Sequence, residues 1–309
     1  MEKIDFNFDF TSDTKGFWDA YRQLVENHMA VLNGANYQKT DFVDPDAKSL
    51  TLRKYHKAVW SKPDERLANN GLMKLNEGDG GYLTCYLTVN GKKQKFRFSS
   101  DIIVTSLIGY TGDAKCQALL QKVRDTMLEQ NYRAYVEGYT RKFYSNIGSF
   151  VLFPTKAKNG FNAVRGCHPA IRDRFDLTLE CIRFYYQRQA NPAYGKDLFK
   201  NENFRNLYKA LFVKDNQDFF NLFADFRAYV DYFYLQDFVS ADYTYVKDLT
   251  RDDDAPVQLW LGSDGNFQDP MPQTADAYLQ WMNNQLAVIE KRTQRIQTAI
   301  AQRSRAAKK

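Results

Sequence analysis

Histidine and paired cysteines are scarce in this chain, and that scarcity restricts the metal sites it can form. The 309 residues include only three histidines, His28, His56 and His168, and four cysteines, of which no two stand at Cys-x-x-Cys spacing. Structural zinc sites take most of their ligands from such pairs, so we predict no metal site. In a reducing compartment the four cysteines would remain free thiols.

Long apolar runs are also absent, and without them a helix cannot span a bilayer. No run in the sequence approaches the ~20 apolar residues that a spanning helix needs. The segment 1–6 lacks the basic start and the apolar middle of a signal peptide. We therefore expect a cytoplasmic protein with no membrane partner.

The chain lacks the short motifs that identify common enzyme classes from sequence. It contains no P-loop, no Gly-x-Gly-x-x-Gly, no His-Glu-x-x-His and no Gly-x-Ser-x-Gly. The sequence therefore indicates no particular cofactor. A functional site has to be sought among residues that the fold brings together.

Charge is distributed unevenly along the chain. The net charge is +6, but residues 291–309 contain seven basic residues and no acidic one, so the first 290 residues together carry −1. We predict a single globular domain over 1–290, followed by a basic helix end or tail over 291–309. That segment is either an electrostatic arm for nucleic acid or an acidic partner, or a solvated helix end whose cations favour the helix dipole.

The hydrophobic pattern predicts an α+β fold that is predominantly helical, with one small antiparallel sheet at about 72–104. Apolar and polar side chains alternate on both sides of Asn90-Gly91, which is typical of a hairpin. An apolar run at 150–153 is compatible with another strand. Because 15% of the residues are aromatic, the core should be rich in aromatic rings. Helical spacing predicts helices at 16–32, 50–60, 217–239, directly after Pro169 and directly after Thr274.

The helix expected after Pro169 carries more charge than a buried helix normally does. Its apolar side chains fall on opposite sides of a helical wheel, which predicts burial, and buried charges are usually paired or functional. In the functional interpretation, His168 is a general acid or base that Asp176 or Glu180 orients. The arginines that would then bind a phosphate group are Arg165, Arg172 and Arg183. In the alternative, the same side chains form a structural ion-pair network.

Two smaller groups of residues have the same double interpretation. Arg53, His56 and Trp60 share one helical face, where the first two would hold a phosphate and Trp60 would stack on a base. His56 is also a candidate catalytic acid or base, but the alternative is a core position for both rings. Arg227 and Asp231 stand one helical turn apart, either as a substrate contact or as an intrahelical salt bridge.

Three segments of the chain resemble a bacterial family of unknown function. They are 51–62 (TLRKYHKAVWSK), 165–183 (RGCHPAIRDRFDLTLECIR) and 225–237 (DFRAYVDYFYLQD), with lesser marks at 99–101 and 153–154. The resemblance covers about residues 49–290. It implies no activity, so it supports the choice of segments and says nothing of a reaction.

These observations leave two hypotheses of different class. In the first, the protein is an enzyme that acts on a nucleotide or nucleic acid, with a His/Arg/carboxylate site and a phosphate-bearing substrate. In the second, it is a non-catalytic binding or interaction protein whose charged helices are an ion-pair network. Either hypothesis is compatible with a monomer or a homodimer.

Overall fold

The protein is described here from a computed structural model that covers residues 4–41, 43–62, 73–89, 91–104, 107–155, 160–259 and 265–306. More than half of the chain is helical and the strands form an antiparallel sheet, so the predicted fold class is confirmed. The helices are α1 (Phe17–Leu32), α2 (Pro45–Lys48), α3 (Leu50–Trp60), α4 (Ala114–Asp125), α5 (Glu129–Tyr144), α6 (Phe161–Cys167), α7 (Phe175–Ala190), α8 (Glu202–Leu211), α9 (Lys214–Phe220), α10 (Phe226–Tyr232) and α11 (Ala275–Ala306). The strands are β1 (Asn76–Glu77), β2 (Leu83–Val89), β3 (Lys92–Ile102) and β4 (Phe150–Pro154). Short 3₁₀ turns are η1 (Asp79–Gly81), η2 (Leu107–Tyr110), η3 (Ile147–Ser149), η4 (Leu198–Lys200) and η5 (Gln236–Phe238).

The sheet is an antiparallel meander in the strand order β1-β2-β3-β4. Every residue of β2 pairs with β3, so the predicted hairpin is confirmed. Gly91 in its turn has a φ of 74°, a conformation that costs glycine little because it has no Cβ. Asn90, the other predicted turn residue, lies outside the described residues.

The strand β4 extends the sheet beyond the predicted range of 72–104. It pairs with β3 from Phe150 opposite Ile102 to Pro154 opposite Phe98. All five residues of β4 are buried, so the strand has no polar side and no period-two pattern. For that reason the apolar run at 150–153 gave only a weak signal in the sequence.

The helix expected directly after Pro169 begins only at Phe175, and this part of the prediction is wrong. The residues in between form turns, and Arg172 and Asp173 have positive φ values of 51° and 59°. A left-handed backbone at two successive residues cannot belong to a right-handed helix. His168 therefore lies at the C-terminal end of α6 and not at the start of the charged helix.

The single helix expected over 217–239 is also wrong, because the structure divides the segment into α9, α10 and η5. Asp225 stands at the division in extended conformation, and its side chain accepts a hydrogen bond from the backbone N–H of Ala228 at 2.7 Å. An aspartate in this geometry is an N-cap and starts a new helix. The aromatic periodicity of the segment concealed this break.

Aromatic side chains fill much of the core, as the composition predicted. The largest of them are almost wholly inaccessible to solvent. They include Trp60, Trp281, Tyr132, Tyr185, Tyr229, Tyr232 and Tyr278. Buried rings of this size contribute a large share of the apolar area that drives folding.

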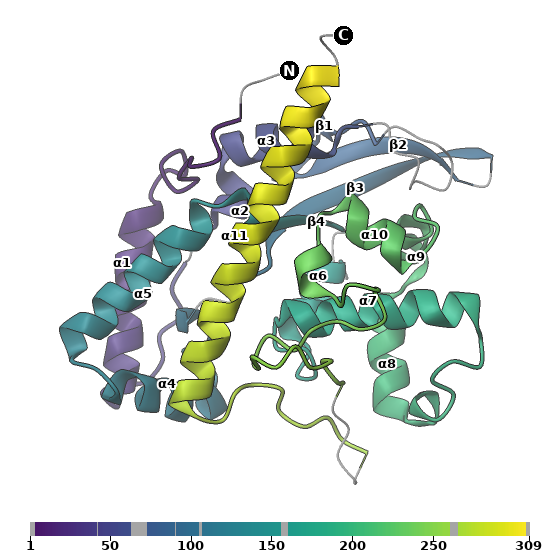
Figure 1. The fold of residues 1–309 in the computed structure, drawn as a ribbon. Coiled ribbons are helices and arrows are strands. Elements are labelled where there is room, and N and C mark those ends of the chain that lie inside the picture. Colours follow the sequence, from purple (N-terminus) through teal and green to yellow (C-terminus); the bar gives the residue numbers. More distant parts are fainter. Residues whose placement is uncertain are drawn as a thin grey trace.

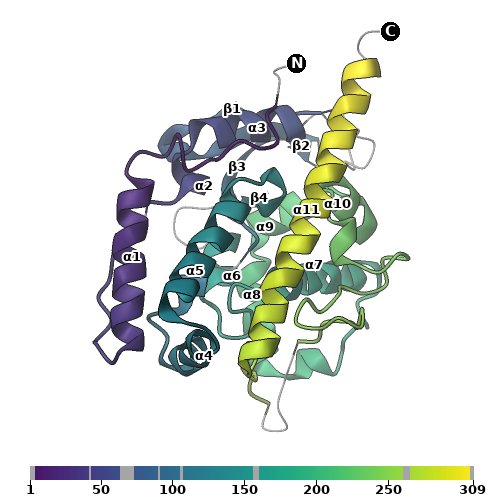
Figure 2. The ribbon, with the colours of Figure 1, turned by 60° about the vertical axis from the view of Figure 1, so that its left-hand side comes forward.

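The longest helix, α11, runs between two groups of helices. Figure 1 shows α1, α4 and α5 on one side of it and α7 to α10 on the other, and in Figure 2 α1 and α5 again lie on one side and α7 and α10 on the other. Its buried stripe includes Met282, Ile289 and Ile296. A Cβ atom added to Gly148 of η3 would lie 2.4 Å from the carbonyl oxygen of Ile289, so the two backbones are in direct contact. This contact explains how α11 approaches the core so closely.

The first turn of the basic segment belongs to this packed part of α11. The Arg292 guanidinium is fully buried and donates hydrogen bonds to the carbonyl oxygens of Phe233 (3.1 Å), Gly148 (2.5 Å) and Phe150 (2.8 Å). Further along, Arg303 donates to the carbonyl of Val59 at 3.2 Å. A role for 291–309 as an arm for nucleic acid stays a prediction. Within the described ranges, no helix is both long and apolar enough to cross a membrane.

Candidate functional site

A cavity of about 440 Å³ opens where α5, the end of α6 and the residues that precede α2, α4 and α7 come together. Its volume lies within the range of about 300–1,000 Å³ that is typical of small-molecule sites. Its chemically distinctive lining residues are Tyr37, Asp44, Asp113, Phe143, Tyr144, Cys167, Arg172 and Asp173. Asp46, Asp101 and Arg165 interact with this lining from behind. We call these eleven residues the acidic pocket.

Asp44 and Asp46 form a carboxyl pair at the start of α2. Asp44 is the N-cap, Pro45 takes the first helical position, and the Asp44 carboxylate accepts a hydrogen bond from the Asp46 backbone N–H at 3.3 Å. The two carboxyl groups are also close enough for each to influence the pKa of the other. Burial, followed by repulsion from Asp44, raises the pKa of Asp46 well above its usual range. Burial likewise raises the pKa of Asp44, whose carboxylate also accepts a hydrogen bond from the Tyr144 hydroxyl at 3.4 Å.

Arg165 of α6 holds two more carboxylates in place. Its side chain is 2% exposed and forms ion pairs with Asp101 of β3 and with Asp173, the latter at 2.8 Å. Burial raises the pKa of Asp101 to about 7, and the Arg165 charge only partly offsets that effect. Burial also raises the pKa of Asp173, although 34% of its side chain is still reached by solvent. Solvent therefore reaches the Asp173 carboxylate, whereas the Arg165 guanidinium that pairs with it is buried.

The turn that carries Arg172 and Asp173 stores backbone strain at this pocket. Neither residue is glycine, yet both have positive φ, a conformation that costs of order 1–3 kcal/mol at each position. Arg172 forms ion pairs with Asp113, which precedes α4, and with Asp269 at 3.3 Å. The Asp173 N–H donates to the carbonyl of Arg165 at 3.2 Å. These contacts hold the turn so that both side chains face the cavity.

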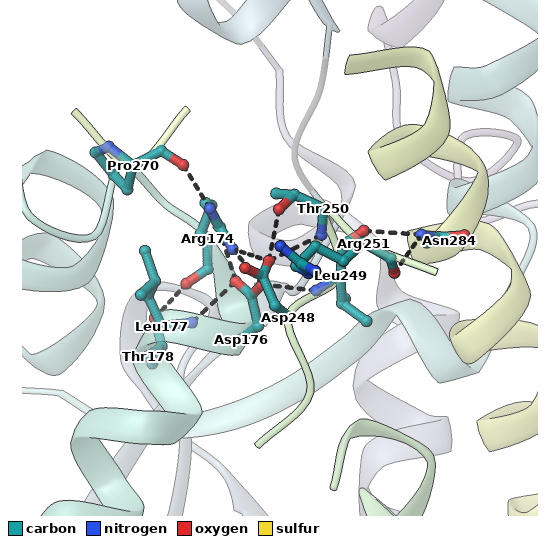
Figure 3. Close-up of polar contacts among 10 residues, drawn as sticks. All are labelled: Arg174, Asp176, Leu177, Thr178, Asp248, Leu249, Thr250, Arg251, Pro270 and Asn284. Atoms are coloured by element: carbon teal, nitrogen blue, oxygen red, sulfur yellow. Dashed lines mark hydrogen bonds and ion pairs between the residues drawn. The ribbon is translucent and has the colours of Figure 1, made fainter. Parts of the chain in front are cut away.

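Arg174 and the predicted catalytic residue Asp176 lie outside the pocket, in the buried network of Figure 3. Arg174 Nε and Nη2 donate to the two Asp176 oxygens at 3.0 and 2.5 Å, and Nη2 also donates to Asp248 at 2.8 Å. The third nitrogen, Nη1, donates to the carbonyl of Pro270. The Asp176 carboxylate is 1% exposed and accepts two backbone N–H groups as well. This geometry favours the structural interpretation of Asp176.

Glu180 and Arg183 form a second closed pair on α7. Arg183 donates to both Glu180 oxygens at 2.7 Å and to the hydroxyl of Tyr194 at 3.1 Å. Burial raises the pKa of Glu180, and the Arg183 hydrogen bonds partly offset that rise. Neither residue lines the acidic pocket. Arg183 is thus engaged with its own helix, which again favours the structural interpretation.

His56 and Trp60 are core residues of α3. Trp60 Nε1 donates to His56 Nδ1 at 2.9 Å, so the proton of the neutral ring sits on Nε2 and is donated to Ser100 Oγ at 2.8 Å. Both side chains are inaccessible to solvent, and burial lowers the pKa of His56 to about 3. Arg53 is half-buried on the same helix, and its guanidinium lies beside Gly81. The catalytic and stacking roles of these residues stay predictions that the burial of His56 and Trp60 does not favour.

His168 and Arg227 occupy separate surfaces. The half-buried His168 ring accepts a hydrogen bond from the Ala170 N–H at 3.2 Å and meets Phe267 edge-on, and burial lowers its pKa. Arg227 is 69% exposed and stands 3.8 Å from Asp231 in the i,i+4 pair that the sequence predicted. Of the predicted site residues, the structure brings only Arg165 and Arg172 into the acidic pocket.

The comparison with known families covers nearly the whole chain. A family model described as "Family of unknown function (DUF6994)" matches residues 4–296, which include every residue of the acidic pocket. The chain belongs to this family. The resemblance to a family of unknown function is therefore confirmed. No curated protein and no solved structure matches the chain.

In this DUF6994 chain the carboxylates of the acidic pocket were not among the predicted site residues. Asp44 and Asp46 precede the first family segment, and Asp113 follows the hairpin without a recognisable motif. Asp101 carried a weak signal, because it lies in one of the lesser marks of the resemblance. Among the described residues, no group of three or more His, Cys, Asp or Glu side chains is arranged to hold a metal ion.

Proposed function

We propose that the protein is an enzyme that performs acid–base chemistry with the Asp44–Asp46 carboxyl pair at the wall of the acidic pocket. The observation that carries this proposal is the pair itself, two neighbouring carboxyl groups with raised pKa values beside a ligand-sized cavity. We infer that the two groups hold one proton between them. A general acid or base must exchange its proton near the working pH, and a raised pKa moves a carboxyl group toward that range. Asp44 lines the cavity and would contact the substrate, whereas Asp46 would hold the shared proton.

The surroundings of the pair support this role. Asp101 and Asp173 add negative charge that keeps the shared proton bound, and the pKa of Asp101 is itself raised to about 7 by burial. The Tyr144 hydroxyl orients Asp44 from the other side. Perturbed carboxyl groups that line a cavity are a physical signature of active sites, although structural networks perturb pKa values too.

The pocket gives less support to a phosphate-bearing substrate. Four of the five arginines predicted to bind substrate are already paired with carboxylates, namely Arg165, Arg172, Arg183 and Arg227. A phosphate group in the pocket would meet more carboxylates than guanidinium groups. The alternative of a purely structural ion-pair network accounts well for α7, but it leaves the solvent-reached Asp173 and the Asp44–Asp46 pair without a purpose.

A carboxyl-directed epoxide tests the proposal without knowledge of the substrate. The ionised oxygen of Asp44 attacks an epoxide carbon, the carbon–oxygen bond of the ring breaks as the ester forms, and the alkoxide takes the shared proton from Asp46. We expect labelling at Asp44 by 1,2-epoxy-3-(4-nitrophenoxy)propane, read by peptide mass spectrometry. Labelling of Asp44 should fall at least about tenfold in Asp46→Asn. A change of one pKa unit alters the equilibrium between protonated and ionised forms about tenfold, and this variant cannot supply the proton.

The matched control is Asp197→Asn, since the Asp197 side chain is 90% exposed and remote from α2. That variant should leave the labelling of Asp44 unchanged. Equal labelling of Asp44 and exposed carboxylates would show that the pair has no special reactivity, and the proposal would then be wrong. If Asp44 is labelled selectively, a screen of ester, amide, glycoside and phosphodiester substrates with the wild type and Asp44→Asn would identify the reaction class.

A further inference from the structure

We propose that the acidic pocket binds a small organic cation with an alkylammonium group. This inference rests on the proposed function for the place of the chemistry and adds the class of the substrate. It is carried by three separate observations, which are the excess of carboxyl groups, the aromatic walls and the size of the cavity.

The charges of the pocket favour a cation. Its carboxyl groups outnumber its two guanidinium groups, Arg165 and Arg172, and Arg172 is shared with Asp269 outside the pocket. Electrostatic interactions are stronger in a partly enclosed site than in water, so this imbalance repels an anion and attracts a cation. The carboxyl groups concerned are Asp44, Asp46, Asp101, Asp113 and Asp173.

The walls favour an organic cation over a metal ion. Tyr37, Phe143 and Tyr144 line the same cavity as the carboxylates, and ammonium groups are attracted to aromatic faces. A cavity of about 440 Å³ is far larger than a bare ion requires. In addition, the described residues contain no metal-binding arrangement of His, Cys, Asp and Glu side chains. A ligand with an ammonium end and an apolar body fits all three facts.

Tyr37 is the residue that the body of such a ligand would contact. It is 44% exposed, unusually so for a large aromatic side chain. Its ring packs against Gly112, where an added Cβ would lie 3.2 Å from the nearest ring atom. Gly112 therefore lets the ring lie along the pocket, and Gly112→Ala would displace it by a few tenths of an ångström without a change of charge.

The test is isothermal titration of the full chain with cadaverine. A neutral molecule of the same length, 1,5-pentanediol, is the matched control, and MgCl2 and AMP represent a metal ion and a phosphate. We expect cadaverine to bind at least about tenfold more tightly than each of these three. Asp173→Asn should weaken cadaverine binding about tenfold, because asparagine tolerates the left-handed backbone but removes a charge. Asp197→Asn should change nothing.

The affinity for cadaverine should rise with pH between 6 and 8. An ammonium group binds the ionised carboxyl groups, so its binding releases protons. For each proton released, the affinity rises about tenfold per pH unit. Burial raises the pKa of Asp101 to about 7, which places its ionisation inside this window. The charged and titratable groups that interact with Asp101 are Arg165, Asp173, Asp44 and Asp46.

The outcomes separate this inference from the proposed function. If cadaverine does not bind but the epoxide still labels Asp44, the inference is wrong and the proposed function survives. If cadaverine binds in the pocket but Asp44 has no special reactivity, the pocket is a binding site and the proposed catalysis is wrong. The inference is also wrong if MgCl2 or AMP binds more tightly than cadaverine. It is likewise wrong if a lysine-containing peptide binds but free cadaverine does not. Gly112→Ala, which displaces the Tyr37 ring, should weaken cadaverine binding.

Discussion

Arg165 and Asp173 are joined by three separate contacts although a turn with left-handed backbone lies between them. The guanidinium pairs with the Asp173 carboxylate at 2.8 Å and donates to its carbonyl at 3.3 Å, and the Asp173 N–H donates to the Arg165 carbonyl at 3.2 Å. Strained backbone persists only where the surrounding structure over-determines it. The same guanidinium also pairs with Asp101 of β3, so one residue fixes both the turn and its distance from the sheet.

The substitution Arg165→Met should therefore be strongly destabilising. It removes the partner of two partly buried carboxylates and the clamp on the strained turn, and breaking a buried pair costs about 3–5 kcal/mol. The measurement is urea-induced unfolding followed by circular dichroism. Arg227→Met is the control, since Arg227 is 69% exposed and the loss should stay below about 1 kcal/mol. Similar losses in both variants would show that the Arg165 contacts contribute little.

Local signals in the sequence predicted the separate elements well. The helices at 16–32 and 50–60 are confirmed to within one residue, because each combines a stripe of apolar residues with readable ends. In α3, for example, Ser49 caps the helix by accepting the N–H of Leu52 at 3.0 Å. Turns with special backbone were not predictable, since nothing in Arg172-Asp173 announces positive φ.

The acidic pocket was not predictable for a different reason. Asp44 and Asp101 belong to α2 and β3, and no periodicity in the sequence relates two such distant positions. The segment 165–183 did include residues of the acidic pocket, because charge on an apolar helix indicates either a functional site or an ion-pair network. The structure shows that the network is on α7, around Asp176, while the pocket lies before it, at Asp173.

The carboxyl pair makes a prediction for the pH dependence of stability. The folded-state pKa of Asp46 is raised, first by burial, so the folded state binds more protons than the unfolded state above pH ~4. Its contribution to stability is therefore largest below the unfolded pKa and declines as the pH rises toward the folded pKa. Asp46→Asn imitates the protonated carboxyl group and should remove this decline.

We expect Asp46→Asn to stabilise the protein relative to wild type, and to do so by more at pH 8 than at pH 5, the difference being on the order of 1 kcal/mol. The comparison is made with wild type at each pH, because burial lowers the pKa of His56 to about 3 and adds an opposite slope below pH ~6.5. Urea unfolding at pH 5, 6.5 and 8 measures the difference. A stability difference that does not vary with pH would mean that Asp46 ionises normally.

Asp176→Asn distinguishes a structural residue from a catalytic one. The substitution replaces a carboxylate that Arg174 and two backbone N–H groups all contact, so we expect a loss of about 3–5 kcal/mol. Asp253→Asn is the matched control, because its ion pair with Arg251 is exposed to solvent and should contribute little to stability. Full stability in Asp176→Asn, together with lost turnover once a substrate is known, would restore the catalytic role predicted for Asp176.

The contact between η3 and α11 is tested by two glycine substitutions with opposite expected signs. At Gly148 an added Cβ would lie 2.4 Å from the Ile289 carbonyl and 2.9 Å from the Thr293 backbone nitrogen, and neither backbone atom can move without shifting α11. Overpacking of this kind costs about 1–3 kcal/mol or more, so Gly148→Ala should destabilise the protein. Gly138 lies inside α5 with no atom within 4 Å of its added Cβ, so Gly138→Ala should stabilise the protein by about 0.5–1 kcal/mol. Thermal unfolding of both variants measures the effect, and a Gly148→Ala protein as stable as wild type would show that α11 does not seat on η3 in the way described.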